Sequence, residues 1–197
     1  MTSMLRVCAL LAAVLTWSGL ASAADPAHPA GGTQPGVSPI RPVASFQEIM
    51  LALVNPSATD LWNAVSTQST AEGVIEHKPT TDEQWLELRH QALILIESGN
   101  LLLLKNRPIV TRGAKIKDQD LPGILGPAEI RRRMDADPAR LARLLHALQG
   151  SAEQALAAID KKDADALTDA GGEIDEACEA CHKTYWYPDA LAPQARK

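Results

Sequence analysis

The amino-acid sequence predicts an all-α fold, an antiparallel four-helix bundle. Four segments carry apolar residues at the three- and four-residue spacing that gathers them on one face of a helix. Residues that commonly begin or end helices bound these segments, and short connections favour antiparallel neighbours. No segment has the pattern of a convincing β-strand.

The length and charge of the chain narrow the classes of protein. At 197 residues it is long enough for one domain with a sizeable core, and a second domain is not expected. The formal net charge is −5, and the sequence has no long basic tract. Because affinity for nucleic acid comes mainly from neutralising phosphates, we expect no nucleic acid among the partners.

Residues 1–23 have the features of a cleaved secretory signal peptide. Arg6 supplies a short basic start, residues 7–20 are apolar, and Ala21 and Ala23 give the small-residue ending of a cleavage site. The apolar run is short for a membrane span, so no stable membrane insertion is expected after cleavage; an uncleaved anchor is the alternative. Cleavage removes the first of three cysteines and exports the other two to an oxidising compartment.

The leader and the first helix follow. Residues 24–44 are rich in Pro, Gly and Ala without periodicity, which predicts a flexible leader, and the bundle domain is expected over residues 45–190. The first helix begins with the capping box SFQE, in which Ser45 and Glu48 each bond the backbone N–H of the other. Pro56 has no N–H, so we expect a kink or a short break one residue earlier and an end by residue 70.

Three further helices are expected. The second covers residues 81–105, and a long connection that we expect to cross the bundle contains a short helical piece around residues 127–134. The third helix starts with Asp137 as its N-cap and Pro138 in its first turn. The fourth covers residues 164–187 and turns these side chains inward: Leu167, Ala170, Ile174, Ala177, Cys178, Cys181 and Tyr185.

The last helix carries the sequence CEACH, in which Cys178, Cys181 and His182 form the C-x-x-C-H pattern of covalent haem attachment. Positions i, i+3 and i+4 share one face of a helix. Two thiols on that face can add to the two vinyl groups of haem, while the imidazole reaches the iron as the proximal ligand. We therefore predict that the two cysteines bind one haem c per chain and that His182 ligates its iron.

Other interpretations of the two cysteines explain the sequence less well. A redox-active C-x-x-C pair favours the start of a helix that follows a strand, whereas this pair lies deep in a C-terminal helix. A zinc site needs a fourth ligand and usually a second Cys or His pair, which the sequence lacks. A structural disulfide between Cys178 and Cys181 leaves His182 unexplained.

Three stretches of the sequence resemble a proteobacterial branch of the cytochrome c′ superfamily, the four-helix-bundle monohaem c-type cytochromes that include low-spin Met/His relatives. These stretches are EIMLALVNPSATDLW, DEQWLELRHQA and CEACHKTYW, and the similarity spans about residues 45–187. The resemblance implies a haem protein of the periplasm, often dimeric, whose distal haem face is covered by the first helix. The family commonly has Arg or Lys four residues after the haem histidine, where this chain has Trp186.

The sequence leaves more than one candidate for the sixth iron ligand. Met50 leads, because low-spin relatives carry a methionine ligand in the first helix; a thioether there raises the reduction potential and suits electron transfer. Met50 also falls on the apolar stripe of its helix, where methionine is a common core residue. Four other side chains rank below it: His77, His90, His146 and Met134.

The sequence thus predicts a periplasmic monohaem c-type cytochrome that carries single electrons and is not an enzyme. Its partners would be periplasmic redox proteins, with a homodimer suggested by the resemblance. The alternative is a five-coordinate haem protein that binds small gases such as NO or CO, in which Met50 only packs; gas scavenging is then an activity to consider. A third alternative is a structural or sensory bundle. No set of residues typical of a hydrolytic active site stands out.

Overall fold

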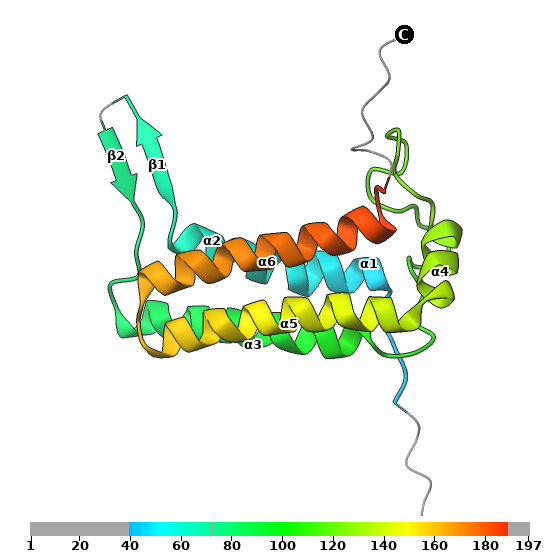
Figure 1. Ribbon diagram of the computed structural model, residues 1–197, viewed down its shortest axis with the longest axis horizontal. Helices are drawn as coiled ribbons and strands as arrows, with labels where there is room; N and C mark the ends of the chain where they lie inside the picture. Colours follow the sequence, from blue (N-terminus) through cyan, green and yellow to red (C-terminus); the bar gives the residue numbers. More distant parts are fainter. Residues whose placement is uncertain (1–39, 72, 189–197) are drawn as a thin grey trace, which may run out of the picture. The chain divides into compact units, whose positions relative to one another are not determined.

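The computed structural model describes residues 40–71 and 73–188, and these residues are mostly helical (Figure 1). The predicted signal peptide and most of the predicted leader lie outside the described residues. The helices are α1 (Phe46–Ile49), the π-helix η1 (Met50–Val54), α2 (Asn55–Ala64), α3 (Asp82–Leu102), α4 (Pro127–Ala136), α5 (Pro138–Asp160) and α6 (Ala164–Tyr185). Two strands, β1 (Thr67–Thr70) and β2 (Gly73–Glu76), complete the structure. None of the helices in the described ranges combines the length and apolarity needed to cross a membrane.

The first helical segment begins as the sequence predicts and then becomes irregular. The Ser45 hydroxyl accepts from the backbone N–H of Glu48 at 3.2 Å, and the Glu48 carboxylate accepts from the N–H of Ser45 at 2.7 Å. After one turn the α-helix widens into the π-helix η1, in which the N–H of Asn55 donates to the carbonyl of Met50. Because Pro56 has no N–H, the carbonyls of the preceding turn lose a donor, and the predicted break takes the form of a π-helix.

The C-terminus of α3 is closed by a buried arginine, and the helix ends earlier than residue 105. Arg107 is only 4% exposed. Its Nε and Nη2 atoms donate to the carbonyl of Leu101 at 3.1 and 2.9 Å, and its Nη1 donates to the carbonyl of Ala44. Carbonyls at the end of a helix lack partners within it, and Arg107 supplies one while tying the segment that precedes α1 to the end of α3.

α5 starts at its predicted cap, and α6 starts at an aspartate cap that was not predicted. The Asp137 carboxylate accepts from the N–H of Arg140 at 2.8 Å, with Pro138 in the first turn of α5. Asp163 caps α6 in the same way, through the N–H of Ala166 at 3.0 Å. A short turn joins the two helices, and Lys162 adopts the left-handed conformation there with φ of 54°.

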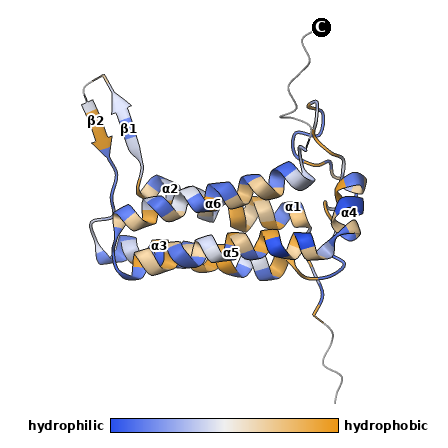
Figure 2. Ribbon diagram, in the orientation of Figure 1, coloured by the Kyte–Doolittle hydropathy of each residue, from blue (hydrophilic) through white to orange (hydrophobic). Residues whose placement is uncertain are grey.

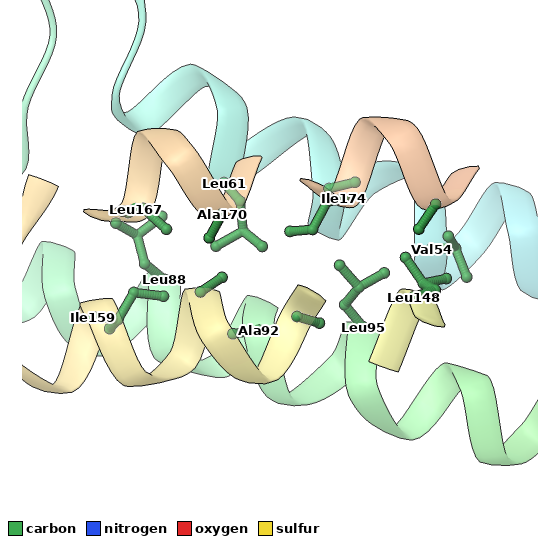
Figure 3. Packing of buried hydrophobic residues seen from close by; sticks show 14 of the residues in the cluster. Val54, Leu61, Leu88, Ala92, Leu95, Leu148, Ile159, Leu167, Ala170 and Ile174 are labelled. Carbon is green, nitrogen blue, oxygen red and sulfur yellow. The ribbon is translucent and has the colours of Figure 1, made fainter. Parts of the chain in front are cut away.

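One core joins the first helical segment to α3, α5 and α6 (Figure 3). Leu95, Leu167 and Ile174 are fully buried. Small side chains let the helices approach closely, and Ala92, Ala152 and Ala155 are likewise fully buried. Hydrophilic and hydrophobic bands succeed one another along α3, α5 and α6 (Figure 2), as expected for helices that turn an apolar stripe toward the core.

A β-hairpin follows the first helical segment, so the prediction that the sequence contains no strand is wrong. β1 pairs antiparallel with β2, with Thr67 opposite Glu76 and Thr70 opposite Gly73. All residues of both strands are exposed, including Val74 at 66% and Ile75 at 47%. The alternating pattern by which strands are found comes from burial of one face, and neither strand buries a face.

The long connection between α3 and α4 passes over one end of the helices. Its carbonyls at Pro108 and Ile109 accept from the N–H groups of Phe46 and Gln47 at 2.7 and 2.9 Å. Near its other end the N–H of Leu125 donates to the carbonyl of Trp186 at 2.8 Å. A second hydrophobic cluster forms beneath it from Ile109, Ile130, Met134 and Tyr185. The connection and α4 therefore cover the end of the molecule that carries CEACH.

Candidate functional site

A pocket of about 280 Å³ lies at this end, between the first helical segment, α6, α4 and the connection. Most of its wall is apolar and comes from Phe46, Met50, Leu51, Val54, Ala58, Trp62, Ile109, Ile116, Ile130 and Met134. Its charged residues are Lys117, Asp175 and Glu179. A mostly apolar pocket with a few polar groups is the usual form of a cofactor site.

All three reactive side chains of CEACH line this pocket. Cys178, Cys181 and His182 are partly buried on α6, and the helix places them on one face because they are three and four residues apart. Both cysteines are free thiols. The arrangement allows two thiols and one imidazole to reach the same bound group from one wall of the pocket.

Burial sets the protonation of the thiols. It raises the pKa of Cys178 to about 11, with smaller contributions from the carboxylates of Asp175 and Glu179. It also raises the pKa of Cys181 to about 12, with a smaller contribution from Cys178. Redox-active cysteines have lowered pKa values, because the thiolate is the nucleophile. The pair therefore lacks the electrostatic environment of a redox-active C-x-x-C motif.

His182 is suited to donate a lone pair. Burial lowers the pKa of its imidazole, an effect that Glu179 and Asp175 oppose. The ring lies edge-on to Trp186, with centroids 5.1 Å apart and an interplanar angle of 79°. It also contacts Tyr187, with centroids 5.8 Å apart. A neutral imidazole is the form that ligates a metal.

Met50 reaches the same pocket from another helix. It lies at the start of η1, is half-buried, and lines both the large pocket and a neighbouring apolar cavity of about 20 Å³ that His182 also lines. π-helical turns occur frequently at functional sites. The structure thus brings Met50 and the CEACH side chains to one pocket.

The lower-ranked candidates divide into two groups. The three histidines are exposed and line neither cavity. The Nδ1 atom of His90 lies 3.7 Å from a carboxylate oxygen of Glu87, and the Nδ1 atom of His146 lies 2.8 Å from Oε1 of Gln149. His77 is in a loop. Met134 differs, because α4 folds over the pocket and this methionine lines it while only 4% exposed. Two methionines therefore border the pocket.

Several pocket residues were not predicted as site residues. Trp62 donates from Nε1 to the carbonyl of Gly171 at 2.9 Å, and a Cβ at Gly171 would lie 3.2 Å from Trp62 Cδ1. Glycine at this position lets the indole lie against α6. Tyr185 and Trp186 also line the pocket, and their Oη and Nε1 atoms are buried without a hydrogen-bond partner among the described residues. Helical spacing from His182 places both near it, but spacing alone does not indicate these contacts.

The donor set fits haem better than a bare metal ion. Within the described ranges, no group of three or more His, Cys, Asp or Glu side chains could hold a metal ion. A porphyrin brings its own nitrogen ligands, so two thiols, one imidazole and an apolar pocket are what haem c requires of the protein. Comparisons with protein-family models, with curated proteins and with solved structures found no match.

Proposed function

We propose that this protein is a periplasmic monohaem c-type cytochrome that carries single electrons. One observation carries the proposal: Cys178, Cys181 and His182 line a single apolar pocket together with Met50. The two thiols would form thioethers with one haem c per chain, and His182 would be the proximal iron ligand. Together with the packing of the first helical segment, α3, α5 and α6, this supports the four-helix bundle of the cytochrome c′ superfamily that the sequence resembles.

Each part of the pocket would have a task. The two cysteines fix the group to α6, and the neutral imidazole of His182 supplies the ligand on that side. The apolar wall and the overlying connection would lower the polarity around the group, and the hydrophobic shell of a redox centre tunes its potential. When bound, haem supplies reversible one-electron chemistry, and the chain needs no catalytic residue for that task.

Met50 is the sixth ligand in this proposal. Met50 lies on η1, whereas CEACH lies on α6. The Met50 side chain lines both the large pocket and the small cavity, as His182 does. A methionine ligand raises the reduction potential and leaves no open position for other ligands, which suits electron transfer. Met134 is the second thioether on the pocket and therefore the natural comparison.

One observation favours a second function. The apolar cavity of about 20 Å³ beside Met50 and His182 is large enough for one small molecule. If Met50 only packs, the iron is five-coordinate, and this cavity would admit a small gas such as NO or CO. The competing proposal is therefore a gas-binding haem protein.

Optical spectra separate the two. The protein, expressed with the haem-attachment machinery, would be recorded in its ferric, ferrous and ferrous-plus-CO forms. We expect a low-spin wild type that does not bind CO, and a Met50→Ala variant that does. Met134→Ala is the matched control and should behave as wild type. A wild type that is high-spin and binds CO would favour the gas-binding function instead.

The proposal includes a location and partners. Cleavage of residues 1–23 would release the protein into the periplasm, where redox proteins are its partners. A homodimer follows from the resemblance, and exposed apolar side chains on α3 would suit it: Leu86, Ile94 and Leu101. Sedimentation of the haem-loaded protein measures the oligomeric state directly.

A further inference from the structure

Two aromatic residues enclose the imidazole of His182. Trp186 lies edge-on to the ring at 5.1 Å between centroids, and Tyr187 lies at 5.8 Å with an interplanar angle of 51°. The two aromatic rings also contact each other at 5.5 Å. The three rings therefore form one cluster at the end of α6.

The protein contacts of the His182 ring are aromatic. Metal-ligating histidines almost always donate their second ring N–H to a carboxylate, a carbonyl or water, which fixes the ring plane. Within the part of the chain that the structure describes, no protein group is hydrogen-bonded to the His182 ring, and its ring contacts are Trp186 and Tyr187. The rotation of the imidazole about its Cβ–Cγ bond is thus limited by packing against aromatic rings.

The two aromatic residues are themselves held in place. The backbone N–H groups of Trp186 and Tyr187 both donate to the carbonyl of His182, at 2.8 and 3.0 Å. The carbonyl of Trp186 accepts from Leu125 in the connection, which fixes the end of α6 from outside. The Tyr187 hydroxyl donates to the Glu179 carboxylate, which also pairs with Lys183 at 3.2 Å.

We propose that Trp186 and Tyr187 form an aromatic clamp that sets the plane of the His182 imidazole. They are positioning residues, since they act through His182, and this inference rests on the proposed function of His182 as an iron ligand. Trp186 stands where the resemblance leads one to expect Arg or Lys. The chain therefore places a neutral aromatic ring, and not a cation, at this position beside its histidine.

A change in the plane of a histidine ligand can be detected by proton NMR of the ferric haem protein, because that plane affects the spread of the paramagnetically shifted haem methyl resonances. We would compare wild type, Trp186→Ala and Trp186→Phe, each as the full haem-loaded protein. We expect the methyl resonances to shift in Trp186→Ala and to return close to their wild-type positions in Trp186→Phe, because phenylalanine retains an edge-on ring. Trp85→Phe is the control: it changes a buried tryptophan of the core that does not line the pocket, so it should lower the thermal midpoint without moving these resonances.

For the haem-loaded protein, two results would overturn the clamp. One is a Trp186→Ala protein whose haem methyl resonances coincide with those of wild type; the other is a Trp85→Phe protein that moves them as far as Trp186→Ala does. A wild type without haem would instead refute the proposed function. In that case the clamp is tested by the chemical shifts of the His182 ring protons in carbon–proton NMR spectra, with the signals assigned by comparison with His182→Gln. Ring currents from Trp186 should displace those protons in wild type and not in Trp186→Ala, and equal shifts in the two proteins would overturn the clamp.

Discussion

At the scale of single residues, the environment of each side chain in CEACH decides which chemistry it can perform. The same two thiols would be redox-active beside a cation, but burial raises both pKa values here and leaves them neutral at pH 7. The same burial lowers the pKa of His182, because the charged form of an imidazole is the protonated one. Burial therefore favours the uncharged form of both kinds of side chain, protonated thiols beside a neutral imidazole.

Arg107 provides a test of how the pocket end is held together. Arg107→Met removes three hydrogen bonds and leaves the carbonyls of Leu101 and Ala44 without these donors. Each lost bond to a charged donor costs about 1.5–3 kcal/mol, partly offset by the better burial of methionine, so we expect a loss of about 3 kcal/mol in unfolding free energy. Urea unfolding measures it. Arg112→Met, at an exposed arginine of the same connection, should change the unfolding free energy by less than about 0.5 kcal/mol.

Gly99 and Gln149 form a coupled pair between α3 and α5. A Cβ at Gly99 would lie 2.6 Å from Gln149 Cγ, and Gln149 donates to the carbonyl of Ile96 at 3.0 Å and to Asn100 at 2.9 Å. Gly99→Ala should gain about 1 kcal/mol of helix propensity but displace Gln149 and lose about 1–3 kcal/mol of hydrogen bonding. In a Gln149→Ala background only the gain remains. We therefore expect Gly99→Ala to stabilise that background by about 1 kcal/mol and to be neutral or destabilising in wild type; equal effects in both backgrounds would show no coupling.

At the scale of elements, the π-helix η1 links a sequence feature, Pro56, to the position of the proposed distal ligand, Met50. Pro56 removes a donor from the turn before it, and the widened turn begins at Met50. Pro56→Ala restores the N–H, so the segment can form a regular α-helix, in which Met50 is rotated relative to the pocket. We expect this variant to bind CO in its ferrous form, as Met50→Ala does. A Pro56→Ala protein that stays low-spin and ignores CO would mean that packing, and not the proline, produces the π-helix.

The β-hairpin is the element that contributes least to stability. Its strand residues are all exposed, and an isolated two-stranded hairpin is at best marginally stable in water. Replacing residues 67–76 by a Gly/Ser loop of equal length should therefore change the unfolding free energy by less than about 1 kcal/mol and leave the haem spectra unchanged. Thermal and urea unfolding of the two proteins provide the comparison. A loss of several kcal/mol would indicate that the hairpin packs against the rest of the protein.

Elements whose ends are marked by local chemistry could be predicted from the sequence. The capping box at Ser45 and the N-cap at Asp137 form as predicted, because a cap needs only residues within one turn. The hairpin was missed because its strands bury no face. The C-terminus of α3 was misplaced because Arg107, five residues beyond the last helical residue, closes it through a tertiary contact.

The candidate site could be predicted only in part. Helical spacing is sufficient to place Cys178, Cys181 and His182 on one face, and the structure puts all three in the pocket. The approach of Met134 depends on how a long irregular connection folds, and the aromatic contacts of His182 depend on the chain just beyond a helix end. Neither feature produces a repeating pattern in the sequence that would predict it.

At the scale of the whole molecule, the residues of the proposed site come from segments far apart in the sequence and meet at one end. The first helical segment brings Met50, the connection and α4 cover the pocket, and α6 carries CEACH. The rest of the core, centred on residues such as Leu95 and Ile174, is filled by the protein's own side chains. Stability and the proposed electron transfer are thus assigned to different parts of one helical domain.

The central claim is that CEACH holds a haem covalently, and the intact mass of the exported protein tests it most directly. The protein would be expressed with its full N-terminal sequence and the haem-attachment machinery, purified from the periplasm and denatured before mass spectrometry. We predict a polypeptide that begins at Ala24 and carries the added mass of one haem, which the double variant Cys178→Ala, Cys181→Ala lacks. A wild-type mass that equals the bare polypeptide, or one that carries a disulfide in place of haem, would contradict the account.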